Sequence, residues 1–229
     1  MEKIDKHYEY LAKLYLRLKG YVVSNLIIHS EQKGYSKTEL DIIGVRMPFH
    51  TQEDRQVNVV DYLECSMDQI EIIFGDVKNF NKVRDLKFNE GLRTNNESIK
   101  KLIKWIGCFE NVSSELIKRF EEHLNLHRKF DWNGFAEFSE GSAIGKINFK
   151  FTFFCPSLPK WEGKGFKYID GEEMVDFIWE CLNKEKIVDT CSRTYPYESW
   201  NELERYVRFF KETETKVTVA DFETAFNNK

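Results

Sequence analysis

The 229-residue sequence is poor in proline, with four residues, and its five cysteines form no Cys-x-x-Cys pair. That pattern excludes the disulfide framework of small secreted domains and disfavours a cysteine zinc site. No stretch approaches the roughly 18 consecutive apolar residues of a membrane span, and no low-complexity tract is present. The N-terminus, Met-Glu-Lys-Ile-Asp, lacks the apolar core of a signal peptide. The sequence therefore predicts a cytoplasmic, globular protein without a membrane association.

Charge is distributed unevenly along the chain. The formal net charge is −4, which disfavours non-specific electrostatic coating of nucleic acid. Between residues 76 and 105, however, eight lysines and arginines stand against four acidic residues, a local balance of +4. A basic segment of this kind is a candidate phosphate-binding surface, although such runs are also common on ordinary solvated faces.

Hydrophobic periodicity predicts an α/β fold with a central mixed β-sheet flanked by helices. Helices are expected at 4–18, 97–106, 114–126, from 170 onward, at 199–211 and from 218, and strands at 21–28, 39–46, 70–79, 146–154 and 166–169. The alternation in 146–154 predicts a strand with one exposed face.

The spacing of these elements predicts two parts of the chain. Residues 1–183 are expected to form the α/β domain, with 47–68 inserted as a hairpin arm, and residues 184–229 a helical C-terminal extension. No internal repeat divides the chain further.

Two expected strands carry isolated charges in apolar surroundings. Asp41 lies in Glu-Leu-Asp-Ile-Ile-Gly-Val-Arg, while Asp76 and Lys78 end Ile-Glu-Ile-Ile-Phe-Gly-Asp-Val-Lys. Side chains two residues apart in a strand share a face, and buried charges are costly unless compensated. Neighbouring carboxylates repel unless a cation lies between them, and Mg²⁺ prefers one or two carboxylates. We therefore expect Asp41, Asp76 and the carbonyl of Val77 to bind Mg²⁺, with Mn²⁺ as a substitute, and Lys78 to position a water.

Simpler interpretations exist for each of these residues. Asp76 and Lys78 could form an ion pair at the end of an edge strand. Glu9, on the helix expected over the strands, could join the site or pair with Lys13 on a solvent-facing surface. A rival tripeptide, Glu-Cys-Ser at 64–66, also ends a possible strand but lacks the lysine.

One histidine pair has helical spacing but is not interpreted as a metal site. His123 and His127 lie one turn apart, as zinc ligands can. No cysteine or acidic residue at ligand spacing accompanies them, so a helix face is the favoured interpretation.

The helix containing Glu9, the Gly-Tyr-Val-Val entry at 20–23, the Glu-Leu-Asp strand with Asp41 and the Asp76-Val77-Lys78 strand together resemble the PD-(D/E)xK, or restriction-endonuclease-like, nuclease superfamily. The similarity is greatest to its Holliday-junction-resolvase and Mrr-type branches. The resemblance implies a helix-strand-strand-strand-helix-strand core. By this match Asp41 and Asp76 would be metal ligands.

The same resemblance implies Mg²⁺-dependent hydrolysis of DNA phosphodiesters in restriction, phage defence or repair, with Lys78 as the catalytic lysine and Glu9 as an auxiliary acid. The sequence departs from the family pattern in two respects: no proline precedes Asp41, and about 35 residues separate the two aspartates.

The basic segment supplies candidate phosphate contacts beside this site. They are Lys82, Arg84, Lys87 and Arg93. A duplex has two strands to cut, so a homodimer or a targeting partner protein is expected alongside DNA. The alternative is a catalytically inactive nuclease-fold protein that acts as a nucleic-acid-binding or protein-interaction module.

Overall fold

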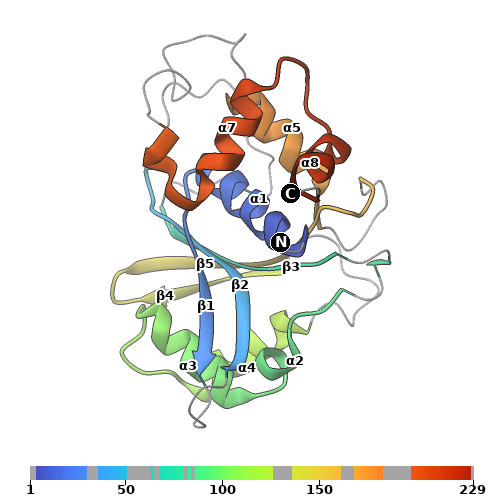
Figure 1. The fold of residues 1–229 in the computed structure, drawn as a ribbon. Coiled ribbons are helices and arrows are strands. Elements are labelled where there is room, and N and C mark those ends of the chain that lie inside the picture. Colours follow the sequence, from blue (N-terminus) through green and yellow to red (C-terminus); the bar gives the residue numbers. More distant parts are fainter. Residues whose placement is uncertain are drawn as a thin grey trace.

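The computed structural model describes residues 4–29, 36–50, 63, 68–79, 82–83, 86–125, 136–160, 168–182 and 197–227. A six-stranded sheet lies at its centre, with five strands in the order β1-β2-β3-β5-β4 (Figure 1). The short sixth strand, β6, pairs with the end of β5 outside this order. The strands are β1 (Val22–His29), β2 (Ser36–Arg46), β3 (Ile70–Val77), β4 (Ala136–Ser142), β5 (Gly145–Cys155) and β6 (Ile169–Asp170). The sheet is mixed, because β5 runs parallel to β3 and β6 while the other pairs are antiparallel.

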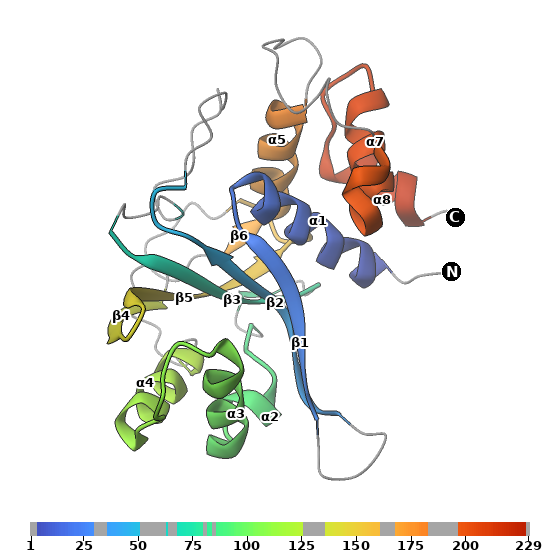
Figure 2. The same ribbon diagram turned by 90° about the vertical axis from the view of Figure 1, so that its left-hand side faces the viewer.

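Helices cover both faces of the sheet (Figures 1 and 2). One face carries α1 (Ile4–Leu18), α5 (Gly171–Leu182), the 3₁₀ segment η4 (Tyr197–Leu203), α7 (Glu204–Glu212) and α8 (Val219–Asn227). The other carries α2 (Glu90–Arg93), α3 (Asn96–Ile106) and α4 (Ser114–Leu124). Each face has its own apolar cluster, so the α/β class with a mixed, helix-flanked sheet is confirmed.

Short-range sequence signals account for the helix boundaries. The chain leaves α1 at Gly20, whose φ of +90° favours glycine, and leaves α3 at Gly107 with φ +73°. Asp170 Oδ1 accepts a hydrogen bond from Glu173 N at 2.8 Å, which caps the start of α5. Thr218 and Asp221 cap the start of α8 reciprocally through side-chain and backbone hydrogen bonds.

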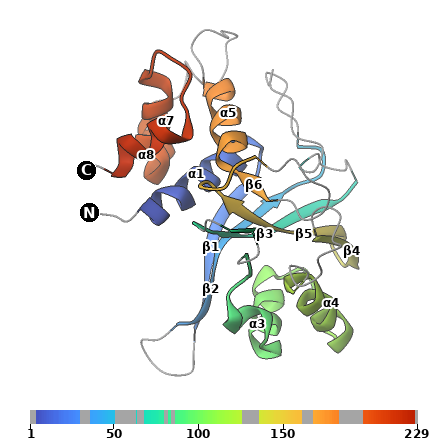
Figure 3. The ribbon, with the colours of Figure 1, turned by 90° about the vertical axis from the view of Figure 1, so that its right-hand side faces the viewer.

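The C-terminal helices pack against the α/β core through α1 and α5 (Figure 3). Side chains of α7 and α8, including Tyr206, Phe210 and Phe222, belong to the same apolar cluster as those of α1. The expected helix at 199–211 begins instead as 3₁₀ turns at Tyr197 and becomes α-helical at Glu204.

The prediction that β5 has one exposed face is wrong. Lys150 is buried, and Glu71 of β3 compensates its charge at 2.9 Å from the ammonium. Glu71 also accepts a hydrogen bond from Tyr21 Oη at 2.8 Å. Asn148 and Thr152 are buried as well. The side of β5 that carries Asn148, Lys150 and Thr152 is therefore buried inside the protein, where these side chains contact other protein groups.

Other expectations meet the limits of the described residues. Most of the expected 47–68 arm and the Glu-Cys-Ser tripeptide at 64–66 lie outside them, as does the turn at 30–35. Strand β4 was not expected from the sequence. None of the described helices has the length and apolarity needed to cross a membrane.

Candidate functional site

An irregularity in β2 sets the position of Asp41. Between the pair Ser24–Ile43 and the pair Leu26–Leu40, β1 advances by two residues and β2 by three. β2 therefore has one extra residue beside Asp41, which is a β-bulge. Bulges bend a strand and redirect the neighbouring side chains, and they are common next to active sites.

The structure brings Asp41 and Asp76 together on adjacent strands. Ile42 of β2 pairs with Gly75 of β3 in an antiparallel register. Asp41 precedes Ile42 and Asp76 follows Gly75, so the two aspartates lie side by side at the same end of these strands. The Val77 N–H donates a hydrogen bond to Asp41 Oδ2 at 2.9 Å. The Asp41 carboxylate is thereby fixed against the chain segment that carries Asp76.

Asp76 is fully buried, and the ammonium of Lys78 lies beside it. Lys78 Nζ lies 3.0 Å from Asp76 Oδ2, and the Lys78 side chain is 13% exposed. Neither Asp76 oxygen accepts a well-directed hydrogen bond from the described residues, although the backbone N–H groups of Asp41 and Asn89 lie nearby. Burial raises the pKa of Asp76 above its ordinary value, and Lys78 opposes this shift only in part.

The two carboxylates destabilise each other's ionised forms. Burial, followed by the charge of Asp76, raises the pKa of Asp41 to about 7. The hydrogen bond from Val77 N and the ammonium of Lys78 act in the opposite direction. At neutral pH without a cation, the site is therefore partly protonated at Asp41.

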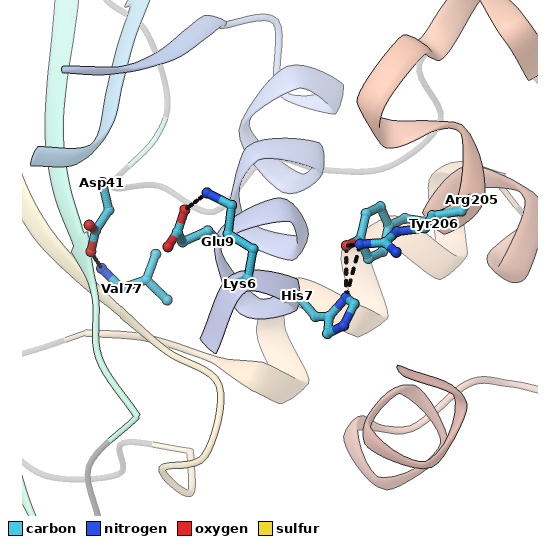
Figure 4. A network of polar contacts seen from close by, with 7 residues as sticks. All are labelled: Lys6, His7, Glu9, Asp41, Val77, Arg205 and Tyr206. Atoms are coloured by element: carbon cyan, nitrogen blue, oxygen red, sulfur yellow. Dashed lines mark hydrogen bonds and ion pairs between the residues drawn. The ribbon is translucent and has the colours of Figure 1, made fainter. Parts of the chain in front are cut away.

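Glu9 of α1 faces this site across the end of the sheet. Figure 4 shows its carboxylate on the side of α1 that faces Asp41 and Val77, paired with Lys6 Nζ at 2.7 Å. The charge of Glu9 contributes to the raised pKa of Asp41. The alternative partner Lys13 is buried, with its ammonium 5.2 Å from the centroid of the Tyr10 ring.

Sequence reasoning missed two polar residues near the site, Asn79 and Lys6. Asn79 Nδ2 donates to Asp5 Oδ1 at 3.0 Å, which fixes the chain just after Lys78 against the first turn of α1. Lys6 was also missed, although its position three residues before Glu9 is the spacing of a helical ion pair. Asn79 carried no comparable signal, because its partner lies 74 residues away.

The donors at this site suit a hard cation with few protein ligands. No group of three or more His, Cys, Asp or Glu side chains able to hold a metal ion occurs among the described residues. Two carboxylates, one of them buried without a well-directed hydrogen bond, are nevertheless compatible with Mg²⁺, which usually retains several waters. A divalent ion would also relieve the repulsion between Asp41 and Asp76.

The expected phosphate contacts have different environments. Lys82 and Lys87 are exposed, whereas Arg84 lies outside the described residues. Arg93 is buried, with Nε donating to Phe88 O at 3.2 Å and Nη1 to Asn125 Oδ1 at 3.4 Å. The Arg93 guanidinium thus joins α2 to the end of α4 and is not presented to solvent.

His123 makes a local contact within α4. Its Nδ1 lies 2.7 Å from Arg119 O, and its ring lies tilted against the rings of Phe138 and Phe151. Burial lowers the pKa of His123. His127 lies outside the described residues.

Comparison with known proteins yields no assignment. No family model matches the chain, and no curated protein or solved structure matches it. The site and the fold are therefore the basis of the functional argument.

Proposed function

We propose that this protein is a metal-dependent nuclease that hydrolyses phosphodiester bonds of DNA at the site formed by Asp41, Asp76 and Lys78. The observation that carries the proposal is the buried Asp76 carboxylate, held 3.0 Å from Lys78 and beside a second carboxylate with a pKa of about 7. Charged groups in such a costly arrangement are concentrated at functional sites.

The chain order is compatible with the resemblance to the PD-(D/E)xK nucleases. After α1, three antiparallel strands are followed by helices, then by β4, and then by β5, which lies parallel to β3. Apart from the additional strand β4, this order is compatible with the helix-strand-strand-strand-helix-strand core that the resemblance implies. It has Asp41 on the second strand and Asp76 on the third, as that family's motif requires.

In this proposal Asp41, Asp76 and the Val77 carbonyl hold Mg²⁺, or Mn²⁺ in its place. When bound, the ion supplies Lewis-acid polarisation of a phosphoryl oxygen. The bulge in β2 and the hydrogen bond from Val77 N hold Asp41 in place before any ligand arrives. The protein thus supplies a pre-positioned pair of anionic ligands.

Lys78 has the chemical role of a positioned ammonium. Its three N–H groups can orient the attacking water and stabilise the charge that develops on the phosphate. Without substrate, Asp76 keeps the Lys78 side chain on the correct face of β3. Glu9, with Lys6, would bind water at the edge of the site as an auxiliary acid.

The exposed Lys82 and Lys87, with Arg84, would contact the phosphates of the bound strand. They follow Lys78 directly in the chain, so the backbone of a nucleic acid bound there would extend away from the site. DNA is preferred to RNA on the basis of the resemblance alone.

The test is a cleavage assay on plasmid, single-stranded DNA and RNA with Mg²⁺ or Mn²⁺, with and without chelator. Cleavage of DNA is expected, and Asp76→Asn and Lys78→Ala should abolish it. Asp176→Asn, at an exposed carboxylate of α5 paired with Lys216, is the matched control and should retain activity. Equal cleavage by Asp76→Asn would mean that the site is wrong or that the activity is a contaminant.

A second candidate is a nuclease-fold protein that binds nucleic acid or a protein without cutting. The observation that favours it is the ion pair between Lys6 and Glu9, which neutralises an acid that faces Asp41. Calorimetric titration separates the two candidates: an absence of Mg²⁺ and Mn²⁺ binding, with retained DNA binding and no cleavage, would support the inactive module.

A further inference from the structure

Strand β1 presents an unusual edge. Within the described part of the chain it pairs along β2 only, so its other side exposes backbone N–H and C=O groups. Its eight residues, Val-Val-Ser-Asn-Leu-Ile-Ile-His, contain no Lys, Arg, Asp, Glu or Pro. Natural edge strands usually carry charge, proline or bulges that prevent pairing with another chain. β1 lacks the charges and the proline, although its pairing with β2 has register shifts between Ser24 and Leu26 and between Ile28 and His29.

Exposed apolar side chains accompany the edge. Val22 is 78% exposed and Ile27 45% exposed, and Trp105 of the neighbouring α3 is 54% exposed. Beside the strand lies a groove of about 280 Å³. Its lining residues are Leu26, Ile27, Ile28, His29, Lys101 and Trp105. The exposed Val22 lies at one end of β1 and the groove lies at the other.

This arrangement is self-complementary. When two copies of one strand pair antiparallel about a two-fold axis perpendicular to the sheet, residues directly opposite each other must point to the same face. Their residue numbers therefore sum to an even value. If the numbers of two opposed residues sum to 50, residues 22 to 28 of one copy pair with the same residues of the other copy in reverse order. Val22 then lies against Ile28 of the other copy, at the groove. If the numbers sum to 52, Val22 has no partner within β1 of the other copy.

We propose that the protein forms a symmetric homodimer by antiparallel pairing of two β1 strands, with Val22 of each copy seated at the groove of the other. The pairing provides hydrogen-bond partners for the backbone groups at the free edge of both β1 strands. It also covers Val22 and Trp105, which lines the groove. Asn25 lies on the two-fold axis, opposite its own counterpart. The proposal does not depend on nuclease activity.

The first test is the molar mass of the full chain in solution, by light scattering or sedimentation across a concentration series. The wild type should have twice the 27.3 kDa mass of one chain. Val22→Lys should be monomeric, because a lysine would be placed against the groove that contains Lys101. Val22 is largely exposed in the single chain, so this variant should keep its fold, as checked by circular dichroism.

The matched control is Ile144→Lys, at an apolar side chain 59% exposed in the turn between β4 and β5. It should remain dimeric. Adding Lys101→Glu to Val22→Lys should restore the dimer through an opposite charge. A monomeric wild type at every concentration, or a dimeric Val22→Lys protein, would overturn the proposal.

The second test measures the register. Asn25→Cys should form an intermolecular disulfide under mild oxidation, because the two copies of residue 25 lie directly opposite each other. Ser24→Cys should not, since its two copies are offset by two residues and exceed the roughly 7 Å limit between bridged Cα atoms. The wild type gives the background from the native cysteines. Cross-linking of Ser24→Cys without Asn25→Cys would refute this register.

Discussion

Lys78 Nζ lies 3.0 Å from Asp76 Oδ2, inside the protein and on one face of β3. The Asp76 carboxylate is fully buried, and Lys78 is the positive charge that compensates it. Removing either partner of a buried pair leaves the other uncompensated. This relationship links the stability of the metal-free protein to the proposed chemistry.

Lys78→Met should lower both activity and stability. Cleavage should fall by about 100-fold or more, the usual effect of losing one group that stabilises transition-state charge. The free energy of unfolding should fall by about 3 kcal/mol or less, because Asp76 can take up a proton instead of remaining charged. Urea denaturation should show a larger loss at pH 8 than at pH 5.

The control for this variant is Lys216→Met, at an exposed lysine paired with Asp176. It should leave cleavage unchanged and stability nearly so. Wild-type activity and stability in Lys78→Met would contradict the assigned role.

Asp41 should make the metal-free protein less stable as the pH rises. Its pKa rises from 3.8 to about 7 on folding, so between these values the unfolded chain has lost a proton that the folded protein keeps. The free energy of unfolding therefore falls across this range, at about 1.4 kcal/mol per unit at most, and levels off above pH 7. Asp41→Asn should remove this loss and be more stable than the wild type at pH 8 with chelator present.

Mg²⁺ should reverse the same effect. Because Asp41 must be ionised to bind a cation, affinity should be greater at pH 8 than at pH 6, and binding at pH 6 should release a proton. Calorimetry in two buffers of different ionisation enthalpy measures that release. An affinity that does not change between pH 6 and 8 would argue against Asp41 as a ligand.

Lys82 and Lys87 should affect DNA binding without affecting stability. Each alanine substitution should weaken binding and reduce the slope of log affinity against log salt by about 0.9 for duplex DNA. Fluorescence anisotropy across a salt series measures both. Arg93→Ala should instead lower stability, since its guanidinium joins α2 and α4. Lys146→Ala, at an exposed residue of β5, is the surface control.

Glu71 and Lys150 should contribute to stability only as a pair. Lys150→Met leaves the buried Glu71 carboxylate with the hydroxyl of Tyr21 but without the ammonium at 2.9 Å, and should cost about 3–5 kcal/mol. Adding Glu71→Leu to Lys150→Met should restore part of that loss. The free energy of unfolding from urea titrations tests this, and an unchanged value for Lys150→Met would contradict it.

Local patterns predicted most of the described elements. The helix of residues 4–18, the strand ending near Asp76 and the capped helix that follows Asp170 all depend on neighbours within a few positions, and the structure contains them. Strand β4 was missed because Ala-Glu-Phe-Ser-Glu-Gly-Ser has neither the apolar alternation nor the β-branched residues of a strand. Its stability comes from pairing with β5.

Long-range contacts explain what sequence patterns could not predict. By its pattern Lys150 is an ordinary exposed strand residue, whereas the structure places it in an ion pair with Glu71, which is distant in the chain. Charged residue types in apolar strands were enough to predict that Asp41, Asp76 and Lys78 lie close together. The bulge that positions Asp41 left no sign in the sequence, because it arises from the register between β1 and β2.

Helix α1 has a different neighbour on each side. Lys6 and Glu9 face Asp41, while the adjacent His7 contacts Tyr206 Oη at 2.9 Å (Figure 4). Tyr8, next in the chain, donates a hydrogen bond to Glu223. The helices at 197–227 thus pack against the side of α1 that faces away from Asp41, although none of their residues belongs to the candidate site. A chain shortened before residue 197 would keep Asp41, Asp76 and Lys78 but lose the support that determines where Glu9 stands.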